Sequence, residues 1–141
     1  MTTPAVRVLS TGGTIASTDT AGGATPTRAG DELVKSAALP VDVDVSVEQI
    51  SQDPGFGMDT GIVDDIAESV RDAGAETGVV VTHGTDTMAE SAYYLDAGLD
   101  PDVPVVFTGA QRRPDEVSAD GPANLQTAVA AALHADVRDA G

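Results

Sequence analysis

The chain has 141 residues, with 23 acidic side chains against 7 basic ones, a formal net charge of −16 at pH 7 and no cysteine. A chain of this length builds one domain with its own core, and the lack of cysteine excludes disulfide scaffolds, thiolate metal sites and cysteine nucleophiles. The negative excess would repel phosphate backbones and anionic lipid, so we expect neither nucleic acid nor a membrane surface as a partner.

Basic residues are scarce, and nearly all of them are arginine. Lys35 is the one lysine. Dense carboxylates with little lysine are typical of halophilic proteins, in which high ionic strength screens surface repulsion. A plain acidic protein from a mesophile is the alternative. Residues 1–7 show no apolar leader, and no apolar run approaches the ~18 to 20 residues of a membrane span. We therefore expect a cytoplasmic protein.

In chain order, the first predicted element is a strand over Ala5–Leu9 that ends in the turn 10–13. A loop rich in glycine and threonine follows over Asp19–Thr27. Asp31–Leu39 has the composition of a helix and ends before a proline. In Val41–Glu48, valine alternates with polar residues, which predicts an edge strand with one face in water.

The middle of the chain continues with a helix and a buried strand. Apolar residues at helical spacing over Asp59–Ala73 predict a helix with Gly74 as its C′ residue. The unbroken valines within Gly78–Thr82 predict a central strand that is buried on both faces.

Three further elements complete the pattern. Asp86–Leu99 is predicted as a helix whose Thr87 and Glu90 form a capping box, Val103–Phe107 as a buried strand and Asp120–His134 as a helix. Strand and helix thus alternate four times. This alternation predicts an α/β fold with a mostly parallel, doubly wound sheet and helices on both faces.

Ligands of open α/β sheets bind outside the carboxyl ends of the strands. Four loops at these predicted ends are rich in hydroxyl groups, over residues 10–17, 50–53, 82–87 and 108–111. In the first loop, adjacent glycines precede Thr14 where a dinucleotide fingerprint would need spaced ones. Such a turn suits a threonine nucleophile with an adjoining oxyanion hole, and a plain turn with a threonine cap is the alternative.

The third loop offers charged and titratable candidates. Asp86 either caps the following helix or binds a ligand ammonium group. His83 is a base candidate for a hydroxyl nucleophile, although a hydrogen-bonded structural histidine is the simpler interpretation. His134 is expected to be a solvated residue in a last helical turn. The sequence has no H-x-x-x-H pair or tight carboxylate cluster, so we expect no metal and no cofactor.

Four motifs in order resemble the N-terminal portion of the bacterial-type, cytoplasmic L-asparaginase family, as found in a halophilic archaeon. They are Ser10-Thr11-Gly12-Gly13-Thr14-Ile15-Ala16, Ser51-Gln52-Asp53, Thr82-His83-Gly84-Thr85-Asp86-Thr87-Met88, and Thr108-Gly109-Ala110-Gln111 with 118–125. The resemblance spans nearly the whole chain. It implies hydrolysis of L-asparagine to L-aspartate and ammonia through a threonine nucleophile and an acyl-enzyme.

The resemblance also implies residue roles. Thr14 matches the nucleophile, Thr85 the group that orients water or assists proton transfer, and Asp86 the carboxylate that binds the α-ammonium group. Ser51 and Gln52 match residues that hold the α-carboxylate and α-amino end of the substrate.

Gly84 is expected to belong to the same substrate-binding site. The family uses no cofactor, and its full-length members are homo-oligomers.

The sequence departs from the family pattern beside the nucleophile. The family has a tyrosine on the mobile loop near this threonine, whereas Ala21–Arg28 contains none and Tyr93 and Tyr94 lie elsewhere. Thr25 or Thr27 is a possible substitute, although a threonine hydroxyl is a far weaker acid than a phenol.

The family's catalytic lysine is also missing. It follows the strand after the Asp120–His134 helix, whereas this sequence stops at Gly141 and Lys35 does not match the position. The C-terminal domain, which completes a neighbouring subunit's site in family members, is absent as well. We therefore expect residues 1–141 to be an incomplete N-terminal asparaginase domain with little or no turnover by itself.

Two alternatives stay open. One is the asparaginase-like subunit of archaeal glutamyl-tRNA(Gln) amidotransferase, which supplies ammonia to a partner. Against it, Arg7 leaves no room for that subunit's extra N-terminal domain, and residues 118–122 fit free asparaginases better. The other is a binding module that holds aspartate or asparagine without chemistry.

Overall fold

The computed structural model describes residues 2–74 and 77–140, so both ends of the predicted domain 1–141 lie outside it. Within these ranges, a parallel sheet is formed by four strands in the order β4 (Asp44–Asp53), β1 (Ala5–Gly12), β5 (Thr77–Thr82) and β6 (Val105–Thr108). From β1 the chain crosses to β4 on one side and then to β5 on the other. The junction of β1 and β5 is therefore the topological switch point of the sheet.

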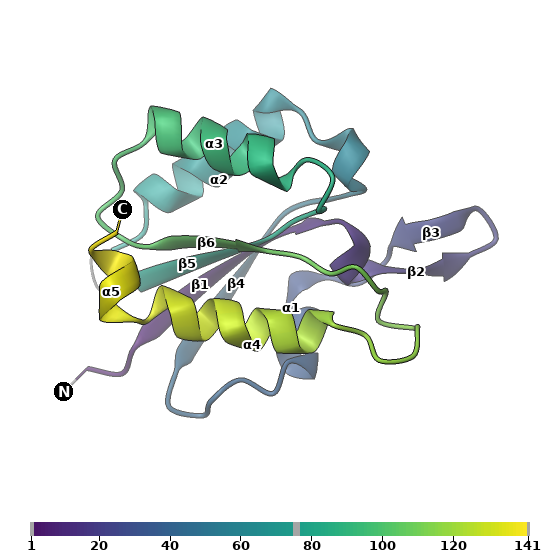
Figure 1. Cartoon of the computed structure of the whole chain (residues 1–141), viewed down its shortest axis with the longest axis horizontal. Coiled ribbons are helices and arrows are strands. Elements are labelled where there is room, and N and C mark those ends of the chain that lie inside the picture. The colour runs from purple at the N-terminus through teal and green to yellow at the C-terminus, as the bar shows by residue number, and fades with distance from the viewer. Residues whose placement is uncertain (1, 75–76, 141) are drawn as a thin grey trace.

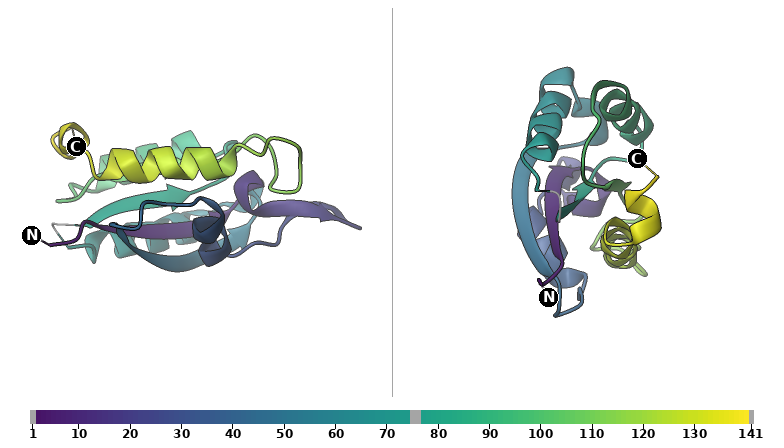
Figure 2. Two further views of the ribbon diagram at one scale, coloured as in Figure 1. Left: turned by 90° about the horizontal axis from the view of Figure 1, so that it is seen from below. Right: turned by 90° about the vertical axis from the view of Figure 1, so that its left-hand side faces the viewer.

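Helices cover both faces of this sheet (Figures 1 and 2). Helices α1 (Gly30–Ser36) and α4 (Gly121–Ala132) pack on one face, and α2 (Thr60–Arg71) and α3 (Met88–Gly98) pack on the other. A short helix, α5 (Ala135–Arg138), follows α4. The predicted doubly wound α/β fold is confirmed. Along the described residues, no helix combines the length and apolar character needed to cross a membrane.

The core divides into two layers because side chains alternate along the buried strands. Val8 and Val80 face α1 and α4, whereas Leu9, Val79 and Val81 face α2 and α3. All five are fully buried, which confirms the prediction that the strand at 78–82 is central.

The predicted edge strand at 41–48 is confirmed in type and corrected in extent. β4 lies at one edge of the sheet and starts at Asp44, whose N–H donates to the Pro4 carbonyl. Val41 is fully exposed and precedes the strand, because a turn closed by the Val43 N–H and the Pro40 carbonyl comes first.

The strand predicted at 103–107 is also corrected. β6 begins at Val105, since Pro104 has no N–H to donate to the ladder and contributes only its carbonyl, which accepts from Val79. Its side chains are half-buried where full burial was expected, because β6 lies at the second edge of the sheet.

A hairpin replaces much of the loop expected at 19–27. Strands β2 (Ser17–Thr20) and β3 (Gly23–Pro26) pair in antiparallel orientation, with Gly23 at φ 98° in the turn. The hairpin projects from the carboxyl end of the sheet (Figure 1). Short 3₁₀ turns, η1 (Thr14–Ala16) and η2 (Gly55–Gly57), follow β1 and β4.

All four predicted helices end earlier than expected, α3 at Gly98 and α4 at Ala132. α1 ends at Ser36, short of Leu39, because Ala38 takes a left-handed φ of 48°. α2 is capped at its start by Asp59 and ends at Arg71, so Gly74 lies one position beyond the expected C′ place.

The predicted capping box of α3 is wrong. Thr87 is the N-cap residue, but its side chain makes no capping hydrogen bond. The Thr87 hydroxyl donates instead to the Gly55 carbonyl at 2.9 Å, because η2 packs against the start of α3. A tertiary contact has taken the hydroxyl that local spacing assigned to the cap.

Candidate active site

The loops after β1 and β5 touch through two glycines. Gly13 has φ 77°, and a Cβ placed on it would lie 2.5 Å from the Gly84 nitrogen, so no larger residue fits. Thr14 directly follows one glycine and Thr85 follows the other. The structure therefore brings the two loops that carry these predicted residues into contact at the switch point of the sheet.

Thr14 is the first residue of η1 and is half-buried. The N-cap of η1 is Gly13, so the alternative of a threonine cap is wrong. Within the described residues, the Thr14 hydroxyl has no hydrogen-bond partner, whereas the nearby Ser17 hydroxyl donates to the Gly13 carbonyl at 2.8 Å. Thr14 is thus a hydroxyl held on a tight turn and left open to a ligand.

Asp86 lies beside the backbone of η2. A Cβ placed on Gly55 would come within 1.7 Å of the Asp86 carboxylate, and one on Gly84 within 3.0 Å. Thr87 occupies the N-cap of α3, so the interpretation of Asp86 as the cap is wrong. Thr85 and Asp86 are both exposed. The carboxylate is therefore available to a cationic ligand group.

Ser51 and Gln52 lie near the end of β4, the strand beside β1. The Ser51 hydroxyl donates to the Thr11 carbonyl at 2.9 Å, and the Gln52 Nε2 donates to the Pro26 carbonyl at 3.3 Å. Ser51 therefore lies against the end of β1, while the amide of Gln52 is turned toward the hairpin. Within the described residues, the Ser51 oxygen and the Gln52 Oε1 can still accept from an ammonium group, and the second Nε2 hydrogen of Gln52 can still be donated to a carboxylate.

His83 is a structural residue. It is fully buried, with Nδ1 2.7 Å from the Gly84 carbonyl and Nε2 2.8 Å from the Ser91 hydroxyl. A carbonyl only accepts, so Nδ1 carries the proton and Nε2 accepts from Ser91. Burial lowers the pKa of His83, which keeps the ring neutral. Both ring nitrogens are occupied, and the interpretation of His83 as a base finds no support.

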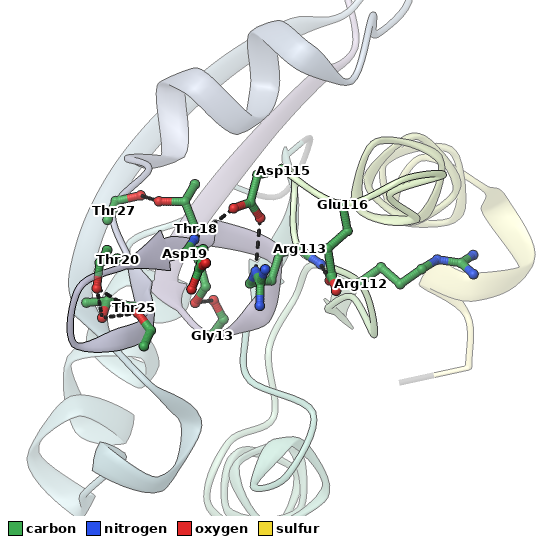
Figure 3. Close-up of polar contacts among 12 residues, drawn as sticks. Gly13, Thr18, Asp19, Thr20, Thr25, Thr27, Arg112, Arg113, Asp115 and Glu116 are labelled. Atoms are coloured by element: carbon green, nitrogen blue, oxygen red, sulfur yellow. Dashed lines mark hydrogen bonds and ion pairs between the residues drawn. The ribbon is translucent and has the colours of Figure 1, made fainter.

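The hydroxyls proposed to replace the family tyrosine are engaged within the hairpin (Figure 3). Thr27 and Thr18 share a hydrogen bond of 2.7 Å, and Thr25 contacts the Thr20 hydroxyl at 3.3 Å. These pairs join threonines of the same hairpin. Neither Thr25 nor Thr27 is directed at Thr14 by a hydrogen bond within the described residues.

Asp115 connects the hairpin to the loop between β6 and α4. Its carboxylate accepts from the Asp19 N–H at 2.8 Å and from the Arg113 guanidinium at 2.9 Å (Figure 3). The Asp19 N–H, with Arg113 second, lowers the pKa of Asp115. Sequence reasoning missed this contact, because nothing in a local pattern links residues that lie 96 positions apart.

Asp120 makes hydrogen bonds within the same loop, between β6 and α4. Its carboxylate accepts from the N–H groups of Gln111 at 3.0 Å and Arg112 at 2.8 Å, which lower the pKa of Asp120. The Asn124 side chain donates to Asp120 and to the Gly109 carbonyl. Two motif residues that sequence reasoning gave no role therefore shape the loop.

The remaining charged candidates lie on α1 and at the start of α5, away from the loops after β1 and β5. The Lys35 ammonium is exposed on α1, 3.8 Å from the Asp31 carboxylate. His134 is exposed and serves as N-cap of α5 rather than in a last turn of α4. Across residues 2–74 and 77–140, no group of three or more acidic or histidine side chains is arranged to hold a metal ion.

The sequence matches a known protein family over nearly its whole length. The family model described as "Asparaginase, N-terminal" matches residues 5–141. The chain belongs to the asparaginase family. This agrees with the resemblance in the four motifs, whose loops all lie at the carboxyl end of the sheet.

Individual asparaginases cover almost all of this chain. It is 37% identical to an L-asparaginase of Bacillus licheniformis over 141 residues, which is 96% of this chain and 44% of that protein. The structure of a probable cytoplasmic L-asparaginase from Campylobacter jejuni superposes with a TM-score of 0.85 at 40% identity, over 96% of this chain and 44% of the other.

A relative of a different name is also similar. A glutamyl-tRNA(Gln) amidotransferase subunit of Halobacterium salinarum is 42% identical over 135 residues, covering 92% of this chain and 31% of that protein. The chain thus spans less than half the length of these relatives.

Proposed function

We propose that this chain is the N-terminal, nucleophile-bearing part of an enzyme that hydrolyses L-asparagine to L-aspartate and ammonia. The observation that carries the proposal is the contact of Gly13 with Gly84, because Thr14 and the pair Thr85 and Asp86 directly follow the touching glycines. Membership of the asparaginase family supports the same reaction class. A halophilic source, a cytoplasmic location, homo-oligomeric assembly and independence of cofactors stay predictions.

In the proposed reaction, the Thr14 oxygen attacks the carbon of the side-chain amide, and the hydroxyl proton passes to the nitrogen that leaves as ammonia. The resulting ester is cleaved by water, which releases aspartate and restores the hydroxyl. Asp86 would bind the α-ammonium group, and Ser51 and Gln52 would hold the α-carboxylate and α-amino end, so that the amide carbon is held against the nucleophile. Thr85 would orient the water or assist proton transfer.

Activation of the nucleophile is the step that these residues do not supply. Within the described residues, both nitrogens of His83 are occupied in the core and Lys35 is exposed on α1, so neither takes the Thr14 proton. We therefore expect the 141-residue chain to release ammonia from asparagine at a rate close to that of its Thr14→Ala variant. A robust rate in molar KCl that disappears in Thr14→Ala would contradict this expectation.

Substrate binding is testable without turnover. Calorimetric titration of the chain with L-aspartate should give a measurable affinity that falls about tenfold or more in Asp86→Asn, since hydrogen bonds to charged groups contribute about 1.5 to 3 kcal/mol. Thr14→Ala should bind aspartate nearly as well as the wild type. An unchanged affinity in Asp86→Asn would remove the proposed ammonium site.

The same chain can separate an enzyme from a binding module. After incubation with a reactive aspartate β-ester, mass spectrometry should find one aspartyl group on Thr14, because the ester carbonyl needs a less activated nucleophile than an amide. No adduct should form on Thr14→Ala. Aspartate binding without any adduct in the wild type would favour the module.

The second candidate is an amidotransferase subunit that supplies ammonia to a partner. Its support is the 42% identity with the amidotransferase subunit of Halobacterium salinarum, against 37% with the Bacillus licheniformis asparaginase. An enzyme that acts on free asparagine has no need of a partner. Ammonia release that begins only when an archaeal amidotransferase partner protein is added would favour this candidate.

A further inference from the structure

Three loops at the carboxyl end of the sheet meet through glycines. Gly55 belongs to η2, the turn after β4, and Gly84 belongs to the loop after β5. A Cβ placed on Gly84 would come within 2.6 Å of the Gly55 Cα and 3.0 Å of the Gly55 nitrogen. Gly84 also meets Gly13 of the loop after β1. The backbone of η2 therefore lies directly against the loop that carries Asp86.

The Asp86 carboxylate lies in the space that a side chain at position 55 would fill. A Cβ placed on Gly55 would collide with the Asp86 Oδ1 and would lie 2.7 Å from its Cγ and 3.1 Å from its Oδ2. These three atoms are the nearest neighbours of that Cβ. A side chain at position 55 and the observed position of the carboxylate therefore exclude each other.

Packing against η2, rather than hydrogen bonding, sets the position of this carboxylate. Along residues 2–74 and 77–140, no hydrogen bond or ion pair holds the Asp86 carboxylate, whereas the adjacent Thr87 hydroxyl donates to the Gly55 carbonyl at 2.9 Å. The Met58 N–H donates to the same carbonyl at 3.1 Å. Thr87 thus fixes η2 to the start of α3, and Asp86 lies against the turn that is fixed there.

We propose that Gly55 is a positioning residue for Asp86. Because Gly55 has no side chain, η2 leaves the carboxylate the position from which it binds the ammonium group of an amino-acid ligand. The role of Asp86 in this statement rests on the function proposed above. Gly55 thereby favours ligands that carry an ammonium group over analogues that lack one, although it acts only through Asp86.

The test compares Gly55→Ala with Gly57→Ala in the 141-residue chain. Both glycines belong to η2, and neither has a positive φ. A Cβ placed on Gly57 would meet only ordinary contacts, the nearest of them the Asp53 Cβ at 3.4 Å. The two variants therefore add the same methyl group to the same turn, and only Gly55→Ala displaces the carboxylate of Asp86.

Two measurements follow the displacement and its effect. The ¹³C NMR signal of the Asp86 carboxyl group, assigned by its loss in Asp86→Ala, should move in Gly55→Ala. The affinity for L-aspartate should fall about tenfold, which is the effect of about one lost hydrogen bond to a charged group. The affinity for succinate should not fall, because succinate has both carboxylates of aspartate and no ammonium group. Gly57→Ala should match the wild type in all three.

A second comparison removes the group through which Gly55 is proposed to act. Asp86→Ala lacks the atoms that a Cβ at position 55 would meet. Adding Gly55→Ala to Asp86→Ala should therefore lower the affinity for L-aspartate no further. A general disturbance of η2 would instead add its own loss to that of Asp86→Ala.

An unmoved Asp86 signal in Gly55→Ala would overturn the proposal, and so would a moved signal with an unchanged affinity for L-aspartate. An equal loss for succinate, or an equal loss in Gly57→Ala, would also overturn it, because the loop as a whole would then be disturbed. If the wild type binds neither ligand, the proposed function fails. The Asp86 signal then still decides whether Gly55 sets the position of the carboxylate.

Discussion

The loops after β1 and β5 meet backbone to backbone, whereas the β2–β3 hairpin and the loop before α4 meet through exposed side chains. Gly13 and Gly84 leave no room for a Cβ between them. Asp115 bridges to the Asp19 N–H and to Arg113 at the surface. Tight packing resists salt and acid, while exposed charged contacts are weakened by both. The turn that carries the candidate nucleophile is therefore held more firmly than the hairpin.

The largest effect is expected from breaking the backbone contact with Gly13→Ala. A left-handed φ and a clash with a neighbouring nitrogen together should lower the free energy of unfolding by about 3 kcal/mol or more. Gly23→Ala is the matched control, because Gly23 has φ 98° with open space around it, and it should cost only about 1 to 2 kcal/mol. Urea unfolding in molar KCl measures both, and equal losses would show that the contact contributes nothing.

A smaller effect is expected in the loop before α4. Asp120→Ala removes the acceptor for the N–H groups of Gln111 and Arg112 and should cost about 1 kcal/mol. Asp136→Ala, at an exposed position on α5, should stay within about 0.5 kcal/mol of the wild type. The same urea experiment applies, and a loss for Asp120→Ala no larger than the control would contradict the role given to Asp120.

Acid should affect His83, at the end of β5, and Asp120, in the loop before α4, in separate pH ranges. The folded pKa of His83 lies below 6.5, so the unfolded chain takes up this proton first, and stability falls as the pH drops below about 6.5. The folded pKa of Asp120 lies below 3.8, so its contribution is present above about pH 4 and is lost as the pH falls through the folded value. NMR amide signals of Gln111 and Arg112 should therefore stay constant until the second range. Movement near pH 6 would contradict this order.

The smallest effect is expected at the hairpin contact. Asp115→Asn keeps an acceptor for the Asp19 N–H but loses the charge that faces Arg113, so hydrogen exchange at Asp19 should become severalfold faster without a measurable change in global stability. Molar KCl should shrink the difference between variant and wild type, although it stabilises the acidic chain as a whole. Asp31→Asn, which removes the exposed partner of Lys35, should leave exchange at Asp19 unchanged.

Elements with a strong local pattern were predictable from the sequence. The run of valines in β5 predicted a strand buried on both faces, and the apolar spacing of α4 predicted a helix. Both predictions are confirmed. The predicted capping box at Thr87 is wrong because the Thr87 hydroxyl is turned toward η2, where it donates to the Gly55 carbonyl. Its oxygen therefore makes no capping hydrogen bond with the first turn of α3. The hairpin was missed because its strands are short and polar, so their pattern resembles a loop.

The candidate site was predictable to the extent that it follows from chain topology. Parallel strands end at one edge of the sheet, so the loops that carry Thr14 and Thr85 were expected at the same edge, whereas the contact of Gly13 with Gly84 was not predicted. The contacts of Gly55 and Asp115 depend on the tertiary fold, and no spacing in the sequence indicates them. The chemical roles of the site residues stay predictions.

The hydrogen bond between His83 and the Gly84 carbonyl also orients the peptide group that joins Gly84 to Thr85. The buried ring of His83 holds the Gly84 carbonyl toward the core at 2.7 Å. A peptide unit is planar and trans, so the N–H of Thr85, which belongs to the same unit, points the opposite way. Within the described residues, this N–H has no backbone acceptor. A histidine that takes no part in proton transfer thus turns an amide dipole outward, beside the turn that carries Thr14.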